Sequence, residues 1–225
     1  MKKIAIFVEG QTEAIFTEKL IYALASYNDV EVVNMKTPKF LSLKTVKTPK
    51  NNTELFFLIC NCEGDDAVKI RIKKNEKKLS ENDYISIIGL RDLYPVSRDN
   101  LQPIIDNLYV GLENVIPVQI IVAVMEIEAW FLQESNHYSK IDTKLTCDLI
   151  TEKTGFNPIS GDASLIDEPA IFLNEIYELV EKNYSKKYAQ VHSITSNLDY
   201  DSICLELNTK LPQLGEYIDA IEKHI

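Results

Sequence analysis

The sequence has few residues of the kinds that build cross-linked, metal-thiolate or membrane-spanning proteins. Its 225 residues include only four cysteines and three histidines. No apolar run approaches the roughly 18 residues that cross a bilayer. The cysteines are too few for a disulfide scaffold, and Cys60-x-Cys62 has no second Cys or His pair at zinc-finger spacing. We therefore expect reduced, structural thiols in a cytoplasmic protein without a membrane partner.

Common catalytic motifs are also missing. There is no Walker A motif and no glycine-rich dinucleotide-binding motif, which argues against nucleotide binding by those routes. The isolated histidines give no serine or cysteine an evident base, which argues against a catalytic triad. Carboxylates are therefore the main candidates for chemistry.

Charge is distributed unevenly along the chain. The formal net charge is −10, but residues 1–100 carry +2 whereas residues 101–225 carry −12. Tight binding to a phosphate backbone needs several lysines or arginines together, so the overall charge argues against it. Eleven of the 24 basic residues fall between Lys36 and Lys78. This region can contact a polyanion locally, or it can simply form a solvated surface.

The pattern of apolar residues predicts strands alternating with helices in the first part of the chain. Short β-branched, apolar runs indicate strands, and amphipathic stretches between them indicate helices. The expected strands are 3–8, 30–33, 55–60, 84–90 and 118–124, and the expected helices between them are 13–26, 65–79 and 101–112. Residues 35–53, with two prolines and five lysines, indicate an exposed excursion. The alternation predicts an α/β fold with a mostly parallel sheet flanked by helices.

Beyond the last expected strand, the sequence indicates helices alone. Amphipathic helices are expected at 170–182, 201–208 and 214–223. We therefore divide the chain into an α/β domain, residues 1–132, and a helical C-terminal subdomain, residues 133–225, packed on it.

Four carboxylates are expected at one edge of the sheet, because parallel α/β sheets bind ligands beyond the carboxyl ends of their strands. Glu9 follows the first strand, Asp92 the fourth, and Glu126 and Glu128 the fifth. The last two share a face if the strand continues through them. Glu13 can face the same place from the first turn of the following helix. The alternative for each acid alone is that it caps a turn or lies in the first turn of a helix.

Carboxylates gathered in this way repel one another unless a cation lies between them. Oxygen ligands without nearby cysteine or histidine suit Mg²⁺ or Mn²⁺. Such metals commonly act on phosphates, by polarising a phosphoryl oxygen or activating a water. The expected metal ligands are Glu9, Asp92, Glu126 and Glu128.

Three motifs give the sequence a family resemblance. VEGQTE at residues 8–13 resembles the signature that opens Toprim domains, the metal-binding fold of topoisomerases, primases and OLD-family nucleases. DLY at residues 92–94 and EIEA at residues 126–129 are similar to motifs of a large bacterial family of unknown function with a Toprim-like fold. Residues 188–221 are similar to the helical tail of that family.

The resemblance implies a Toprim-like fold and a metal-dependent phosphodiester hydrolase, that is, a nuclease. Glu9 is then a catalytic metal ligand or general base, and Asp92 a catalytic metal ligand. Toprim proteins carry a second aspartate where this chain has Tyr94, and a phenol is a poor Mg²⁺ ligand because its pKa is about 10. Glu126 or Glu128 can supply the missing carboxylate; otherwise the site is weak or inactive. Glu13 and Tyr94 are expected beside the ligands.

The resemblance also implies partners. Relatives of Toprim nucleases often work beside ATP-hydrolysing proteins in defence against phage. A nucleic acid is therefore the expected substrate, and an ATPase is a candidate protein partner. The alternative is a non-catalytic Toprim-like module that binds a partner through its acidic helical half. Affinity for Mg²⁺ or Mn²⁺ distinguishes the two hypotheses.

Overall fold

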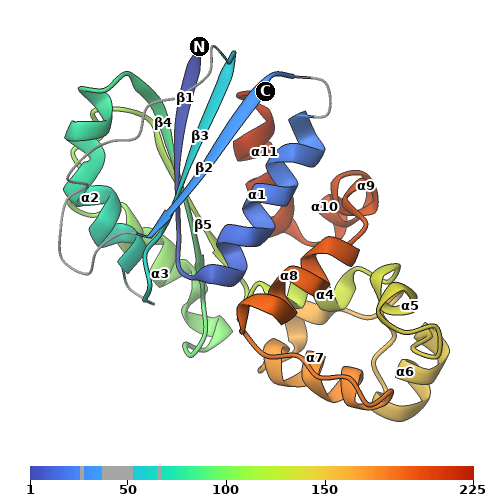
Figure 1. The fold of residues 1–225 in the computed structure, drawn as a ribbon. Helices are drawn as coiled ribbons and strands as arrows, with labels where there is room; N and C mark the ends of the chain where they lie inside the picture. Colours follow the sequence, from blue (N-terminus) through green and yellow to red (C-terminus); the bar gives the residue numbers. More distant parts are fainter. Residues whose placement is uncertain (26–27, 37–52, 65–66) are drawn as a thin grey trace.

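A parallel sheet forms the centre of the molecule (Figure 1). The computed structural model describes residues 1–25, 28–36, 53–64 and 67–225. The strands are β1 (Lys2–Val8), β2 (Val30–Lys36), β3 (Leu55–Asn61), β4 (Tyr84–Asp92) and β5 (Val118–Ala123). They lie in the order β2-β3-β1-β4-β5, and every neighbouring pair is parallel. The predicted α/β class is confirmed, whereas the excursion expected at 35–53 lies largely outside the described residues.

Helices cover both faces of the sheet (Figure 1). Helices α1 (Gln11–Ala25) and α11 (Pro212–Glu222) pack on one face, and α2 (Ala67–Ser80) and α3 (Leu101–Leu108) pack on the other. Successive residues of β1 point to opposite helical layers. Ile4 and Ile6 pack with α1, whereas Ala5 and Phe7 pack with α2. A strand buried on both faces needs apolar residues at successive positions, which accounts for the unbroken apolar runs in the sequence.

The connections reverse direction between two adjacent strands. Helix α1 follows β1 on one face of the sheet, whereas α3 follows the neighbouring β4 on the other. Such a reversal opens a crevice at the carboxyl ends of the two strands, where open α/β sheets bind ligands. Glu9 directly follows β1 and Asp92 ends β4, so both lie at this crevice.

Helices also build the C-terminal part. They are α4 (Glu128–Gln133), α5 (His137–Ile141), α6 (Cys147–Thr154), α7 (Pro169–Glu178), α8 (Tyr188–Asn197), α9 (Tyr200–Ser202), a π-helical turn (Ile203–Leu207), α10 (Asn208–Lys210) and α11, with a 3-10 turn at Ala163–Leu165. A second 3-10 turn, Arg98–Asn100, precedes α3 in the α/β part. The helices expected at 170–182 and 214–223 correspond to α7 and α11. The segment 201–208 is broken into short helical turns.

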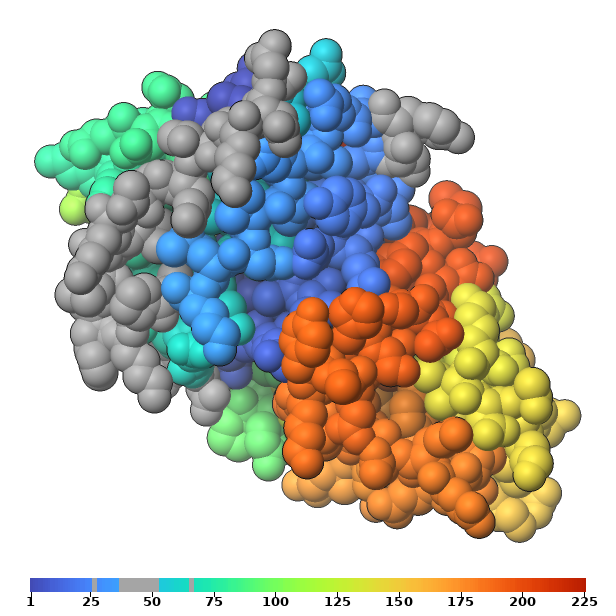
Figure 2. Space-filling view, viewed as in Figure 1, coloured from blue at the N-terminus to red at the C-terminus, as the bar shows by residue number. Residues whose placement is uncertain are grey.

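The helical part packs directly on the sheet layer. One hydrophobic cluster contains Ile88 of β4, Phe16 of α1, Leu173 of α7 and Ile218 of α11. Figure 2 shows the orange C-terminal segment lying against the blue α1 segment. The domain boundary near residue 132 stays a prediction. Within the described residues, no helix combines the length and the apolar character needed to span a membrane.

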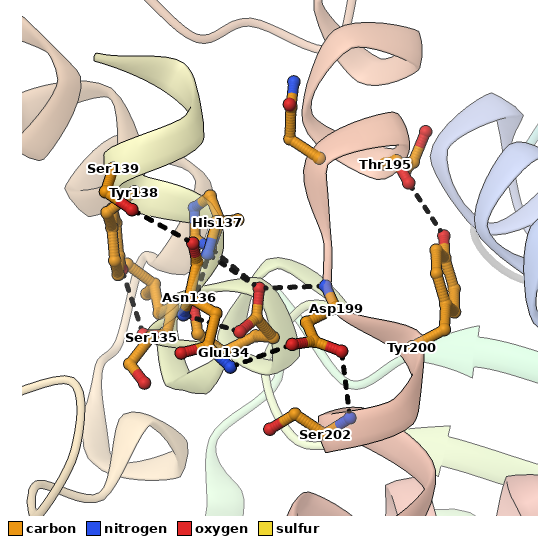
Figure 3. Close-up of polar contacts among 12 residues, drawn as sticks. Glu134, Ser135, Asn136, His137, Tyr138, Ser139, Thr195, Asp199, Tyr200 and Ser202 are labelled. Atoms are coloured by element: carbon orange, nitrogen blue, oxygen red, sulfur yellow. Dashed lines mark hydrogen bonds and ion pairs between the residues drawn. The ribbon is translucent and has the colours of Figure 1, made fainter. Parts of the chain in front are cut away.

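A buried carboxylate ties the end of α4 to the start of α9 (Figure 3). Oε1 of Glu134 accepts the backbone N–H of Asn136 at 2.6 Å, and Oε2 accepts those of His137 at 3.0 Å and Asp199 at 3.2 Å. Oδ1 of Asp199 in turn accepts the backbone N–H of Ser202 at 3.2 Å. Because Glu134 directly follows α4, these bonds hold in place the helix that begins with one of the predicted metal ligands.

Candidate metal site at the sheet edge

Three carboxylates meet beyond the carboxyl ends of β4 and β5. Oxygen atoms of Asp92, Glu126 and Glu128 lie within 4.8 Å of one another, and all three residues are buried. Asp92 is the last residue of β4, whereas Glu126 and Glu128 follow β5. The structure therefore brings together three of the four residues that the sequence predicted as metal ligands.

The two glutamates do not reach this place along a strand. The fifth strand ends at Ala123, so the condition under which Glu126 and Glu128 would share a strand face is not met. Met125 has a φ of 61°, which turns the chain between the strand and the next helix. Glu128 is the first residue of α4. These carboxylates are brought together by a turn and the start of a helix, not by the alternation of side chains along a strand.

Glu9 contacts the same group of residues through a neighbouring strand. Its Oε2 accepts the backbone N–H of Asp92 at 3.1 Å. Oδ1 of Asp92 accepts the backbone N–H of Ile127 at 2.9 Å, which holds the turn between β5 and α4 against the end of β4. A cleft of about 370 Å³ opens here, and Glu9, Asp92 and Glu13 are among its lining residues. Glu9 thus lies at the edge of the three-acid cluster.

Glu13 lies in the first turn of α1, which begins at Gln11, two residues earlier than predicted. Its Oε2 accepts the backbone N–H of Gly10 at 2.8 Å, and the residue is buried. A glutamate that bonds back to the start of its own helix satisfies a backbone donor that the helix leaves open. Glu13 therefore has a structural partner as well as a place beside the acids.

Tyr94 contributes its backbone to the site. Its N–H donates to the carbonyl oxygen of Met125 at 2.8 Å, which joins the chain after β4 to the turn after β5. The side chain is 38% exposed, and within the described chain its phenol makes no hydrogen bond to the acids. Tyr94 thus helps to shape the site through its backbone.

A lysine from the helical part lies among the acids. The Nζ atom of Lys186 is 2.8 Å from Oε1 of Glu126, 3.4 Å from Oε2 of Glu128 and 3.9 Å from Oδ2 of Asp92. Lys186 belongs to the connection between α7 and α8. Sequence reasoning missed it, because no motif links a lysine to a glutamate 60 residues earlier. The one available signal was its position in the strongly acidic half of the chain.

Two more contacts join the helical part to the acids. The phenol of Tyr184 donates to Oε1 of Glu128 at 2.7 Å, and the backbone N–H of Ala170 donates to Oε2 of Glu126 at 2.9 Å. In contrast, Oε2 of Glu128 is buried and has no hydrogen-bond partner among the described residues. The helical part therefore orients the carboxylates and leaves one buried oxygen with an ion pair to Lys186 but no hydrogen bond.

Burial and mutual repulsion shift the ionisation of these groups. Burial raises the pKa of Asp92 well above its usual value, and the charges of Glu13 and Glu128 raise it further. Burial also raises the pKa of Glu128 to about 7, against the opposing effect of Lys186. For Lys186, burial lowers the pKa, but the carboxylates of Glu128 and Asp92 outweigh burial, so the net pKa is raised. Positive charge therefore stabilises the ionised form of the cluster.

The donor set fits a hard divalent cation. Asp92, Glu126 and Glu128 offer only carboxylate oxygens, in a cluster compact enough for one ion. One of these oxygens, Oε2 of Glu128, is buried and makes no hydrogen bond within the described chain. Oxygen ligands of this kind are typical of Mg²⁺ and Mn²⁺ sites. The three residues could hold such an ion, with Glu9 beside it.

Comparisons with protein-family models, with curated proteins and with solved structures gave no match to this chain. The Toprim resemblance therefore stays a prediction that depends on three sequence motifs. The chemistry of the site has to be inferred from its own residues.

Proposed function

We propose that the protein is a metal-dependent phosphodiester hydrolase, a nuclease of the Toprim type that uses Mg²⁺ or Mn²⁺. The observation that carries this proposal is the convergence of Asp92, Glu126 and Glu128 within 4.8 Å at the carboxyl edge of a parallel sheet. When bound there, the metal would supply a Lewis acid for a phosphoryl oxygen and lower the pKa of a bound water.

The residues of the chain have separate roles in this proposal. Asp92, Glu126 and Glu128 hold the cation, and the bond from Ile127 to Oδ1 of Asp92 keeps that carboxylate in place. Glu9 borders the cleft beside them, so it is the group placed to take a proton from an attacking water. Burial of the three carboxylates strengthens the interactions of each charge.

A basic cleft near the end of β4 supports a polyanionic substrate. Lys69 and Lys73 of α2 and Arg91 of β4 line a cleft of about 490 Å³, and Arg91 directly precedes Asp92 in the strand. Lys69 and Lys73 belong to the basic region between Lys36 and Lys78, and Arg91 follows that region in the sequence. The sequence indicated that this region can contact a polyanion. Much of that region, residues 37–52, lies outside the described residues. The cleft gives a strand of nucleic acid a place to lie despite the net charge of −10.

The ion pairs of Lys186 favour a second candidate function. An ammonium that contacts three carboxylates already offsets part of their repulsion, so the cluster can join the two parts of a non-catalytic module. Such a module would bind a partner, for example an ATPase in phage defence, through its acidic helical surface. It would need no metal and would cleave nothing.

The test is to incubate the purified full chain with labelled single-stranded and double-stranded DNA and RNA, with Mn²⁺, with Mg²⁺ or with a chelator. We expect cleavage that requires metal and is lost in Asp92→Asn, which keeps an acceptor for the N–H of Ile127. Glu175→Gln, an exposed change on α7, is the matched control. Failure of all substrates, together with no affinity for Mn²⁺, would favour the partner-binding module.

A further inference from the structure

The ammonium of Lys186 lies at unequal distances from the three carboxylates of the acid cluster. Its Nζ is within hydrogen-bond distance of Glu126, at 2.8 Å, but lies 3.4 Å from Oε2 of Glu128 and 3.9 Å from Oδ2 of Asp92. Oε2 of Glu128 is fully buried and makes no hydrogen bond within the described chain. A single ammonium therefore leaves this buried carboxylate oxygen with a distant ion pair and no hydrogen bond, which is costly compared with a cation that contacts all three acids closely.

We infer that Lys186 is the resident cation of the metal-free site and that a divalent metal displaces its ammonium from the three carboxylates. This inference rests on the metal site of the proposed function and adds a lysine that metal binding must move. The same three side chains, Asp92, Glu126 and Glu128, contact Nζ and form the candidate ligand set. A metal and an ammonium in one group of ligands repel each other, so the two compete.

The position of Lys186 allows its ammonium to move away from the three carboxylates. The side chain of Lys186 is 45% exposed, whereas those of Glu126 and Glu128 are 10% and 0% exposed. Lys186 also lines the cleft that opens beside Glu9 and Asp92. A lysine has a flexible four-carbon stem, so rotation of that stem carries the charge outward without moving the backbone.

Neighbouring contacts keep the backbone in place during this displacement. The phenol of Tyr184 donates to Glu128 at 2.7 Å, and its backbone N–H donates to Oδ1 of Asn174 at 2.9 Å. These bonds hold the connection between α7 and α8 two residues before Lys186. The displaced ammonium then borders the cleft by which a phosphate would approach the acids, where its charge favours an anion.

The experiment compares Mn²⁺ affinity by isothermal titration calorimetry for the full-length wild type, Lys186→Met and Lys187→Met. Lys187 is exposed and carries the same charge next in sequence, so its variant measures the general effect of losing one positive charge. We expect Lys186→Met to bind Mn²⁺ about tenfold more tightly or better, and Lys187→Met to bind nearly as the wild type does. Equal or weaker binding by a folded Lys186→Met would overturn the inference and leave the metal site standing. No Mn²⁺ binding by any of the three proteins would overturn both this inference and the proposed function.

A second measurement uses the wild type alone and so does not depend on the folding of a variant. The protein is treated with an amine-acylating reagent with and without Mn²⁺, and modification is quantified by mass spectrometry. An ammonium that is ion-paired with three carboxylates reacts less readily than a free one, so Mn²⁺ should increase modification of Lys186 severalfold while that of Lys187 stays constant. Unchanged or reduced modification of Lys186 at a Mn²⁺ concentration that saturates the site would overturn the displacement.

Discussion

The backbone N–H of Asp92 donates a 3.1 Å hydrogen bond to Oε2 of Glu9, although 83 positions separate the two residues. The bond joins the ends of β1 and β4, adjacent strands whose following helices lie on opposite faces of the sheet. The crevice that this reversal opens is therefore bordered by a carboxylate from each strand. Position in the topology, together with the acid residues, makes this edge the candidate site.

Glu9→Gln should remove most of the metal-dependent cleavage while leaving the fold intact. The amide keeps an oxygen that can accept the N–H of Asp92, but it removes the charge and the base. We expect cleavage to fall by about 10²-fold or more, as for the loss of a positioned general base. Rates on a labelled nucleic acid in Mn²⁺ measure this, with Glu175→Gln as control. If the glutamine variant cleaves as fast as the wild type, Glu9 has no catalytic role.

The strands of the sheet could be predicted from the sequence because the apolar pattern that indicates a strand is local. Runs such as residues 4–8 and 87–90 are apolar at successive positions, and this pattern indicates a strand covered on both faces. Given parallel strands, residues that follow strand ends must lie at one edge. The placing of Glu9, Asp92, Glu126 and Glu128 near that edge follows from this rule alone.

The rest of the site depends on tertiary contacts that no local pattern encodes. Lys186 and Tyr184 come from a connection 60 and 56 residues after the glutamates they contact. The predicted fifth strand ends one residue beyond β5, but the turn that follows was missed, because the positive φ of Met125 is adopted by a residue that gives no turn signal. Long-range packing, not residue type, decides which lysine reaches the acids.

Metal-free stability should fall as pH rises because of Glu128. Its pKa is raised from 4.5 to about 7 in the folded protein, mainly by burial, so the folded state keeps a proton that the unfolded state releases. The free energy of unfolding therefore decreases between these pH values, by an amount on the order of 3 kcal/mol from this group. Urea denaturation at several pH values from 4 to about 8 measures it. Glu128→Gln should lack this component, and parallel curves for the two proteins would contradict the prediction.

Mn²⁺ should stabilise the folded protein and a chelator should reverse the effect. Binding to the folded state alone adds about 2.7 kcal/mol when the free ion is a hundred times its Kd. The thermal midpoint should therefore rise with Mn²⁺ in the wild type and in Glu175→Gln. It should rise much less in Asp92→Asn, which lacks one charged ligand. The same rise in all three proteins would place the bound ion elsewhere.

Glu134→Gln should destabilise the fold without touching the acid cluster directly. The Glu134 carboxylate accepts three backbone N–H groups and is fully buried, whereas an amide presents a donor to at least one of them (Figure 3). Leaving one such donor unsatisfied costs about 1–3 kcal/mol, so we expect the free energy of unfolding to fall by at least that amount. Urea denaturation beside Glu175→Gln measures the loss. An unchanged midpoint and slope would mean that these bonds add little to stability.

Substitution of Lys69 and Lys73 by Gln should weaken binding of nucleic acid without changing Mn²⁺ affinity. Both line the basic cleft of α2, on the face of the sheet opposite α1. Each phosphate contact that is lost should reduce the slope of log affinity against log salt by about one. The double variant Lys144→Gln, Lys210→Gln changes the net charge equally from exposed positions in the helical part. Filter binding of a labelled oligonucleotide across a salt series compares them. If both double variants lose affinity to the same extent and with the same slope, the protein's total charge governs binding and the cleft does not guide the strand.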